Sequence, residues 1–177
     1  MRIVKQMQSI ILIAHNIRSC HNVGSFLRTA DGLGIEEVIF TGYTPYPHTN
    51  NDERLPHISM KLNRQIHKSA LGAETTQNWN YSLDIFDAIK KLKSRGYTVA
   101  ALEQSEYSTL LPSYNPPEKI ALIVGREVEG IEDEVLEMSD LIIEIPMAGE
   151  KESFNVSQAA AIALYHCKFF NNITIDR

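Results

Sequence analysis

The chain has 177 residues, of which 44% are hydrophobic and 22% charged, and its formal net charge is −5. This composition favours one globular domain with a sizeable core over a disordered chain, and the negative charge argues mildly against a nucleic-acid partner. The absence of a signal peptide, of a membrane-length apolar run and of a disulfide framework predicts a cytoplasmic protein that does not engage a membrane.

Apolar runs of strand length alternate with segments of helical periodicity. In the first half of the chain, the pattern predicts a strand over 8–14, a helix from Asn22 to about 33, a strand over 37–41, a helix over about 60–71 and a helix from Ser82 to a stop before Gly96. In the second half, it predicts strands over 97–102 and 119–124, a helix over 132–138, a strand over 141–145 and a helix from Asn155 to about 170. Asn22, Ser59 and Ser82 are the expected N-caps of the first three helices. Residues 42–56 and 103–117 are expected to be loops.

Strands that alternate with helices predict an α/β fold, a single domain over residues 1–177 with a mostly parallel sheet and helices on both faces. No repeat and no linker divides the chain, and no separate RNA-binding extension is expected.

Three segments, residues 22–28, 125–130 and 145–156, stand where a predicted strand gives way to a loop and then to a helix. Open α/β sheets bind ligands at this edge. We therefore expect the three segments to form one small-molecule site, with Arg28 projecting toward it.

The three segments resemble the signature motifs of the SpoU/TrmH branch of the SPOUT methyltransferases. The matching residues are Asn22, Gly24 and Arg28 in the first motif, Gly125, Glu127 and Gly130 in the second, and Ile145, Pro146, Met147, Ser153, Asn155 and Val156 in the third, with Phe154 where Leu is usual. The resemblance implies a 2′-O-ribose methyltransferase that acts on RNA with S-adenosylmethionine, releases S-adenosylhomocysteine and needs no metal. It also implies a homodimer and a SPOUT-type fold with a C-terminal trefoil knot.

The resemblance further implies which residues form the site. The catalytic set is Arg28, Asn22, Glu127, Ser153 and Asn155, and the cofactor-binding set is Leu102, Gly125, Gly130, Ile145, Met147 and Phe154. Because free arginine stays protonated, we expect Arg28 to anchor an RNA phosphate and stabilise the developing alkoxide, and not to act as a base.

Simpler interpretations stand beside these roles. Asn22, Ser153 and Asn155 could serve as plain helix caps. Glu127 is expected to hold Arg18 or Asn22, or to touch the substrate, and could also be a solvated loop acid. Glu129 has no motif match and is expected to be a surface residue.

Residues 1–72 hold eight Lys/Arg against five Asp/Glu, so a polyanion could dock on this half of the chain. Lys61, Arg64 and Lys68 share one predicted helix face, and the RNA-binding set is completed by Arg18 and Arg54. An ordinary solvated face is an equal alternative. Tyr43 and Tyr46 could stack on an unpaired base. Without an RNA-binding extension, tRNA is favoured over rRNA.

Two other functions compete with this prediction. One is a catalytically inactive RNA-binding protein that retains the fold, and the other is a different α/β nucleotide enzyme, which the lack of phosphate-loop motifs disfavours. The six histidines lack metal-ligand spacing. In the last helix, residues such as Ala159, Ala163 and Cys167 predict core packing, and Phe169 with Phe170 indicates a partner surface.

Overall fold

The computed structural model describes residues 8–170. In this range seven strands form one sheet in the order β3-β2-β1-β6-β4-β7-β5, and every neighbouring pair is parallel. The elements in chain order are β1 Ser9–His15, α1 Cys20–Leu33, β2 Glu37–Thr41, α2 Pro56–Ala70, α3 Ala73–Thr76, β3 Trp79–Ser82, α4 Ile85–Ser94, β4 Thr98–Leu102, β5 Thr109–Leu110, the 3₁₀ turn η1 Leu111–Ser113, β6 Lys119–Val124, α5 Asp133–Met138, β7 Leu141–Glu144 and α6 Val156–Phe169. The predicted α/β class and parallel sheet are confirmed.

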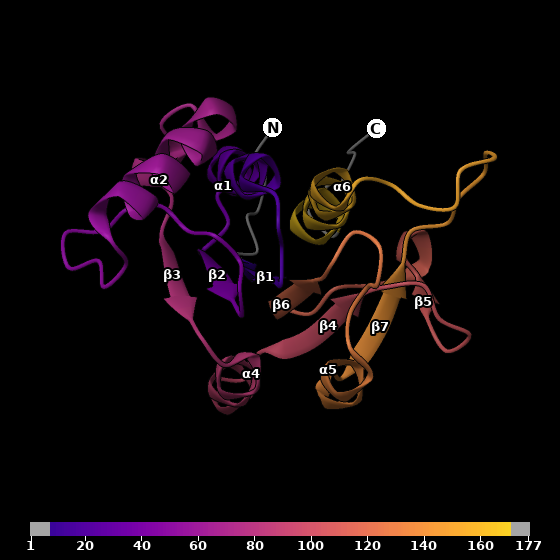
Figure 1. The fold of residues 1–177 in the computed structure, drawn as a ribbon. Coiled ribbons are helices and arrows are strands. Elements are labelled where there is room, and N and C mark those ends of the chain that lie inside the picture. Colours follow the sequence, from indigo (N-terminus) through magenta and orange to yellow (C-terminus); the bar gives the residue numbers. More distant parts are fainter. Residues whose placement is uncertain (1–7, 171–177) are drawn as a thin grey trace, which may run out of the picture.

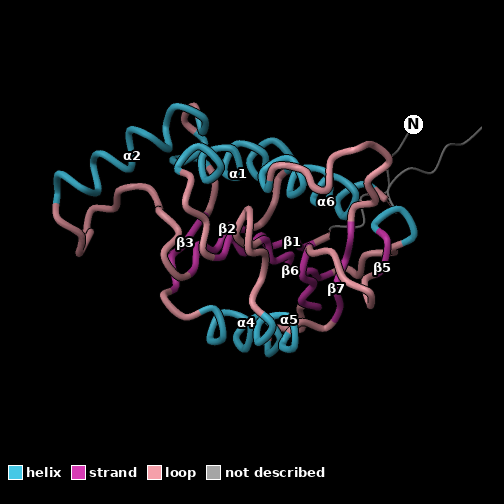
Figure 2. Tube along the Cα trace, turned by 45° about the vertical axis from the view of Figure 1, so that its right-hand side comes forward, coloured by secondary structure: helices cyan, strands magenta, loops and turns pink. Residues whose placement is uncertain are grey.

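Helices cover both faces of the sheet, as Figures 1 and 2 show. Helices α1, α2 and α6 lie on one face, and α4 and α5 lie on the other. The alternation of side chains along β1 sorts the core accordingly: Ile10, Leu12 and Ala14 belong to the cluster beneath α1 and α6, while Ile11 and Ile13 belong to the cluster above α4. Within 8–170 no helix is both long and apolar enough to cross a bilayer.

The predicted N-caps of three helices were wrong. Helix α1 begins at Cys20, because the side chain of Ser19 accepts the backbone N–H of Asn22, so Asn22 lies inside the helix. Helix α2 begins earlier than Ser59 because Pro56 suits the first helical position. Asp84, and not Ser82, caps α4 by accepting the N–H of Phe86.

Four short elements were missed in the sequence. They are α3, β3, β5 and η1, of two to four residues each, which is too short for a periodic pattern to reveal. Strand β3 forms only because it pairs with β2 at the edge of the sheet. The other strands and helices differ from the predicted ranges by a few residues at their ends.

Candidate functional site

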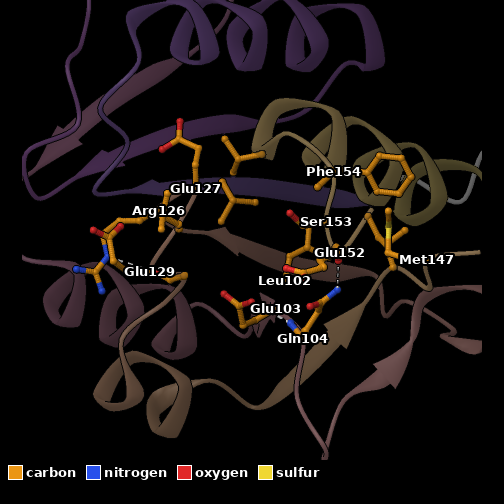
Figure 3. Close-up of a pocket in the computed structure, with 17 residues that line it drawn as sticks. Leu102, Glu103, Gln104, Arg126, Glu127, Glu129, Met147, Glu152, Ser153 and Phe154 are labelled. Atoms are coloured by element: carbon orange, nitrogen blue, oxygen red, sulfur yellow. Dashed lines mark hydrogen bonds between the residues drawn. The ribbon is translucent and has the colours of Figure 1, made fainter. Parts of the chain in front are cut away.

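A cavity of about 300 Å³ opens at the carboxyl ends of β4, β6 and β7 (Figure 3). Its walls come from the end of β4, the loop after β6, the segment after β7 and the start of α6. All six predicted cofactor-binding residues line it, and so do Glu127 and Ser153. The parallel sheet brings these segments together because their strands end at the same edge.

Two glycines shape the loop after β6. Gly130 has a φ of +70°, and a Cβ there would lie 2.5 Å from Oε2 of Glu103. A Cβ at Gly125 would lie 2.6 Å from the side chain of Ile131. Arg126 closes the loop by an antiparallel bridge to Gly130 and donates from Nε to the Gly130 carbonyl at 3.2 Å. Both motif glycines therefore permit a tight loop that a larger residue would open.

Two residues directly after β4 hold the cavity's two loops, and the sequence pattern did not reveal either. Glu103 accepts the backbone N–H of Ile131 at 3.0 Å. Gln104 donates from Nε2 to the carbonyl of Glu152 at 2.7 Å. The available signal was their position at the end of a buried strand, next to the strand ends that carry the motifs.

The three motif segments are joined by a chain of hydrogen bonds. Asn22 donates from Nδ2 to Glu127 at 2.6 Å, and Asn155 donates from Nδ2 to Oδ1 of Asn22 at 3.4 Å. Asn155 also caps α6 by accepting the N–H of Ser157. The predicted contact of Glu127 with Asn22 is confirmed. The N-cap function considered for Ser153 falls to Asn155, and the exposed Ser153 lies on the cavity wall.

Arg18 contacts Glu129, which lines the cavity. Arg18 pairs with Glu129 at 3.7 Å, and not with Glu127. Both side chains are largely exposed, so this ion pair contributes little to stability. Glu129 is exposed, as expected of a surface residue, and it also lines the cavity.

Arg28 does not reach the cavity of its own chain. It is exposed on α1 and is not among the lining residues. The arginine in the cavity wall is Arg126. Helix α1 presents Arg28 to solvent, so the expectation that Arg28 projects toward the site is not met within this single chain, and its catalytic role stays a prediction.

A partly buried polar network lies behind the cavity loop. Glu132 accepts Nδ2 of Asn16 at 2.9 Å and faces Nε2 of His15 at 3.3 Å and Nη2 of Arg126 at 3.5 Å. Asn16 has a φ of 54° and accepts the backbone N–H of Tyr43 at 3.2 Å. Asparagine tolerates this left-handed conformation better than most residues. Asn16 thus connects the loop after β2 to the loop after β6.

The network is held in one protonation state at neutral pH. Burial lowers the pKa of His15 below its usual 6.5 and outweighs the attraction of the Glu132 carboxylate. Burial alone would raise the pKa of Glu132, but hydrogen bonds from its backbone and Asn16, with the charge of Arg126 and the charge that His15 gains on protonation in acid, hold it below its usual value. A neutral His15 therefore faces an ionised Glu132.

Some of the side chains predicted to contact RNA are free to do so, and one is already engaged within the protein. Lys61, Arg64 and Lys68 are exposed on α2. Arg54, by contrast, pairs with Asp52 at 2.5 Å, donates to the carbonyls of Tyr46 and Pro47, and lies 3.5 Å over the Tyr46 ring. The structure therefore gives Arg54 a role inside its own loop.

The ring of Tyr46 is also engaged in contacts within the protein. The ring stacks on Tyr81 at 4.3 Å and lies under Arg54. The suggested stacking of Tyr46 on an RNA base is therefore wrong for this arrangement, whereas Tyr43 is 51% exposed. Among the residues that the structure describes, no cluster of His, Cys, Asp and Glu suits a metal ion.

Comparisons with known proteins agree with this geometry. The model of the SpoU rRNA Methylase family matches residues 9–165. The tRNA (guanosine(18)-2'-O)-methyltransferase of Aquifex aeolicus is 28% identical over 167 residues, which cover 93% of this chain and 71% of that protein. The 23S rRNA (guanosine-2'-O-)-methyltransferase RlmB of Neisseria meningitidis is 31% identical over 155 residues, which cover 88% of this chain and 56% of that protein.

Solved structures share the fold. An AdoMet-bound rRNA methyltransferase from Sinorhizobium meliloti has a TM-score of 0.75 at 21% identity, over 94% of this chain and 58% of that one. The TrmH/SpoU tRNA modifying enzyme of A. aeolicus has a TM-score of 0.74 at 23% identity, over 93% of this chain and 76% of that one.

Proposed function

Because the chain belongs to the SpoU rRNA methylase family, we propose that it transfers a methyl group from S-adenosylmethionine to the 2′-hydroxyl of a ribose in RNA. One observation carries the proposal: two segments far apart in sequence, 125–130 and 145–156, line one cavity, and hydrogen bonds of Asn22 with Glu127 and Asn155 tie the first motif segment to them. The relatives named above as 2′-O-methyltransferases support the reaction class.

The cavity suits the proposed donor. S-adenosylmethionine supplies a methyl group on a cationic sulfonium and carries apolar and polar parts. The apolar lining includes Leu102, Val124, Ile145, Met147, Phe154, Val156 and Ala159, and the acidic lining comprises Glu103, Glu127, Glu129 and Glu152. Acidic side chains favour a cation, and the apolar wall offers contact for a flat ring. Against these four acids, Arg126 is the lining cation.

The same acidic lining is unsuited to RNA phosphates. We therefore propose that the ribose enters alone, while its phosphate stays outside with a cationic partner. The hydrogen bond between Asn22 and Glu127 would orient the loop after β6, and the 2′-hydroxyl of the ribose would lie against this loop. The exposed Arg28 would anchor the phosphate and stabilise the developing alkoxide.

Arg28 can take this role if it comes from a second copy of the chain, and we propose a homodimer for this reason. Helix α6 supports such an association, since Ile162, Tyr165 and Phe170 expose 40%, 58% and 45% of their surface. Helix α1, which carries Arg28, packs beside α6. We also propose the C-terminal trefoil knot, which is supported by the insertion of β6 between β1 and β4.

Within RNA we propose tRNA as the substrate and, accordingly, the cytoplasm as the compartment. The support is the A. aeolicus relative, which acts on tRNA by its name and matches 93% of this chain. Mapping 2′-O-methyl marks on tRNA and rRNA in a deletion strain tests this choice. A mark lost only from 23S rRNA would overturn it.

Two measurements test the reaction itself. Calorimetry should show binding of S-adenosylmethionine and S-adenosylhomocysteine, and binding of neither would favour the inactive RNA-binding protein. In single-turnover assays with RNA from the deletion strain, Arg28→Ala and Arg28→Lys should each slow methyl transfer by about a hundredfold or more. Near-native rates for both variants would show that Arg28 is not catalytic.

A further inference from the structure

The outward face of α2 carries a row of basic side chains. His57, Lys61, Arg64 and Lys68 recur at the i, i+4, i+7 and i+11 positions, so they fall within about 60° of one another around the helix. All four are exposed, and no Asp or Glu occurs within Pro56–Ala70. The opposite face packs against the protein through Ile66 and Ala70. We call these four residues the α2 stripe.

The charges of the α2 stripe are not neutralised by the protein. Within 8–170, Lys61, Arg64 and Lys68 make no ion pair, although the chain as a whole carries an excess of acids. By contrast, Lys93 pairs with Asp140 and Arg95 pairs with Glu36. Unpaired cations on a helix without acids produce a local positive field, which is available to an external polyanion.

The helix that carries the stripe is firmly held. Asn63 of α2 accepts the backbone N–H of His48 at 2.9 Å, and Ser69 donates to the carbonyl of His21 at 2.8 Å. The loop before the helix is braced by the pair of Arg54 with the buried Asp52. The α2 stripe is therefore presented in one orientation, so little ordering is needed when it binds.

We propose that the α2 stripe binds the phosphate backbone of the RNA substrate outside the nucleotide that is methylated. Its first and last residues are roughly 16 Å apart along the helix, which is long enough to meet more than one phosphate. Lysine and arginine contacts to phosphates position a nucleic acid without reading its sequence. This inference rests on the proposed function, since it takes the acceptor to be RNA.

The stripe is separate from the donor cavity. None of its residues lines the cavity, and α2 lies beside α1 at the β3 edge of the sheet, whereas the cavity lies at β4, β6 and β7 (Figures 1 and 2). Changes in the stripe should therefore alter RNA affinity and leave donor affinity unchanged.

The test compares two double variants that change net charge equally. Lys61→Glu/Arg64→Glu removes the centre of the stripe, and Lys90→Glu/Lys91→Glu alters exposed lysines of α4 on the opposite face of the sheet. Fluorescence anisotropy would measure binding of bulk tRNA without donor at several salt concentrations, and calorimetry would measure S-adenosylmethionine binding.

The stripe variant should bind RNA at least about tenfold more weakly than the α4 control and lower the salt slope by roughly two. If α2 fails to fold in this variant, the neutral Lys61→Gln/Arg64→Gln replaces it, with Lys90→Gln/Lys91→Gln as the control of equal charge change. Equal RNA affinity of the stripe and control variants would overturn the stripe proposal alone. Absence of RNA binding by the wild-type protein would overturn the proposed function and the stripe together.

Discussion

At the scale of single residues, the residue type at some positions of the site is required by a neighbouring atom that lies very close or by a left-handed backbone conformation. Gly130 needs a positive φ and leaves room for Glu103, which in turn holds Ile131. Asn16 adopts a left-handed conformation and accepts the N–H of Tyr43. These roles depend on neighbours that are distant in sequence, so the identity of the residue alone did not reveal them.

Gly130→Ala should weaken donor binding. A non-glycine residue at this φ, with its Cβ against Glu103, costs about 1–3 kcal/mol, and donor affinity should fall by roughly tenfold, because about 1.4 kcal/mol corresponds to that factor. Calorimetry with S-adenosylmethionine measures the change. Gly149→Ala is the control, because a Cβ there meets no atom within 4 Å. Equal affinities for the two variants would contradict the role assigned to Gly130.

Acidification should destabilise the fold through His15. Its pKa in the folded state lies below its usual 6.5, so the unfolded chain takes up the proton first and stability falls as the pH drops below about 6.5. The slope is at most about 1.4 kcal/mol per pH unit for one group. The free energy of unfolding in urea, measured between pH 7.5 and 5.5, should decline in the wild type and be flatter in His15→Gln. Parallel declines in both proteins would contradict this assignment.

Glu132 acts in the same direction at lower pH. Its pKa is depressed, so its stabilising contribution is present above its usual value of 4.5 and is lost as the pH falls through its folded-state pKa. The two effects are therefore separated along the pH axis, and the window above pH 5.5 reports on His15.

At the scale of elements, contacts between neighbouring helices and between strand ends assemble the site. Helix α1 approaches α2 closely at Gly24, where a Cβ would clash with Ser69 and with the carbonyl of Ile66. Gly24 was recognised only as a motif residue, and its packing role became visible when α2 was placed. The same contact sets α2, and with it the α2 stripe, against α1.

Gly24→Ala should therefore separate α1 from α2. Overpacking at this contact should lower the free energy of unfolding by about 1–3 kcal/mol. Gly32→Ala lies in the same helix and meets no atom within 4 Å, so it should be neutral or stabilising by up to about 1 kcal/mol. Chemical denaturation of both variants measures the difference, and a Gly24→Ala variant as stable as Gly32→Ala would disprove the packing role.

At the scale of the whole molecule, the position of Arg28 is the reason for which we propose a second copy of the chain. Arg28 is exposed and absent from the cavity of its own chain. The exposed apolar residues of α6 provide a surface on which two copies could associate. The active unit would then contain two composite sites, each with a cavity from one subunit and an arginine from the other.

Mixed dimers test this arrangement. A dimer of one Arg28→Ala subunit and one Gly130→Ala subunit, isolated with two different tags, has one cavity that faces an intact arginine. It should recover roughly half of the wild-type methyl transfer, since one of two composite sites is intact. At a donor concentration well below the dissociation constant of Gly130→Ala, each homodimeric variant serves as a control with low activity. An inactive mixed dimer would show that Arg28 serves the cavity of its own subunit.

The sequence by itself determined the fold class, the strands and helices of more than a few residues, and the walls of the cavity. Periodicity and capping signals are local, and parallel strands bring their carboxyl ends to one edge, so the order of strands and helices was enough to place segments 125–130 and 145–156 together. The six cofactor-binding residues, which the family resemblance implied, line one cavity at this edge.

Only the tertiary structure decided which side chains meet. It assigned Glu103 and Gln104 to hold the cavity loops, placed Arg126 and not Arg28 in the cavity wall, and used Arg54 within its own loop. These outcomes depend on helix orientation and on hydrogen bonds between residues far apart in sequence. Such contacts are set by packing in three dimensions, which a one-dimensional pattern does not contain.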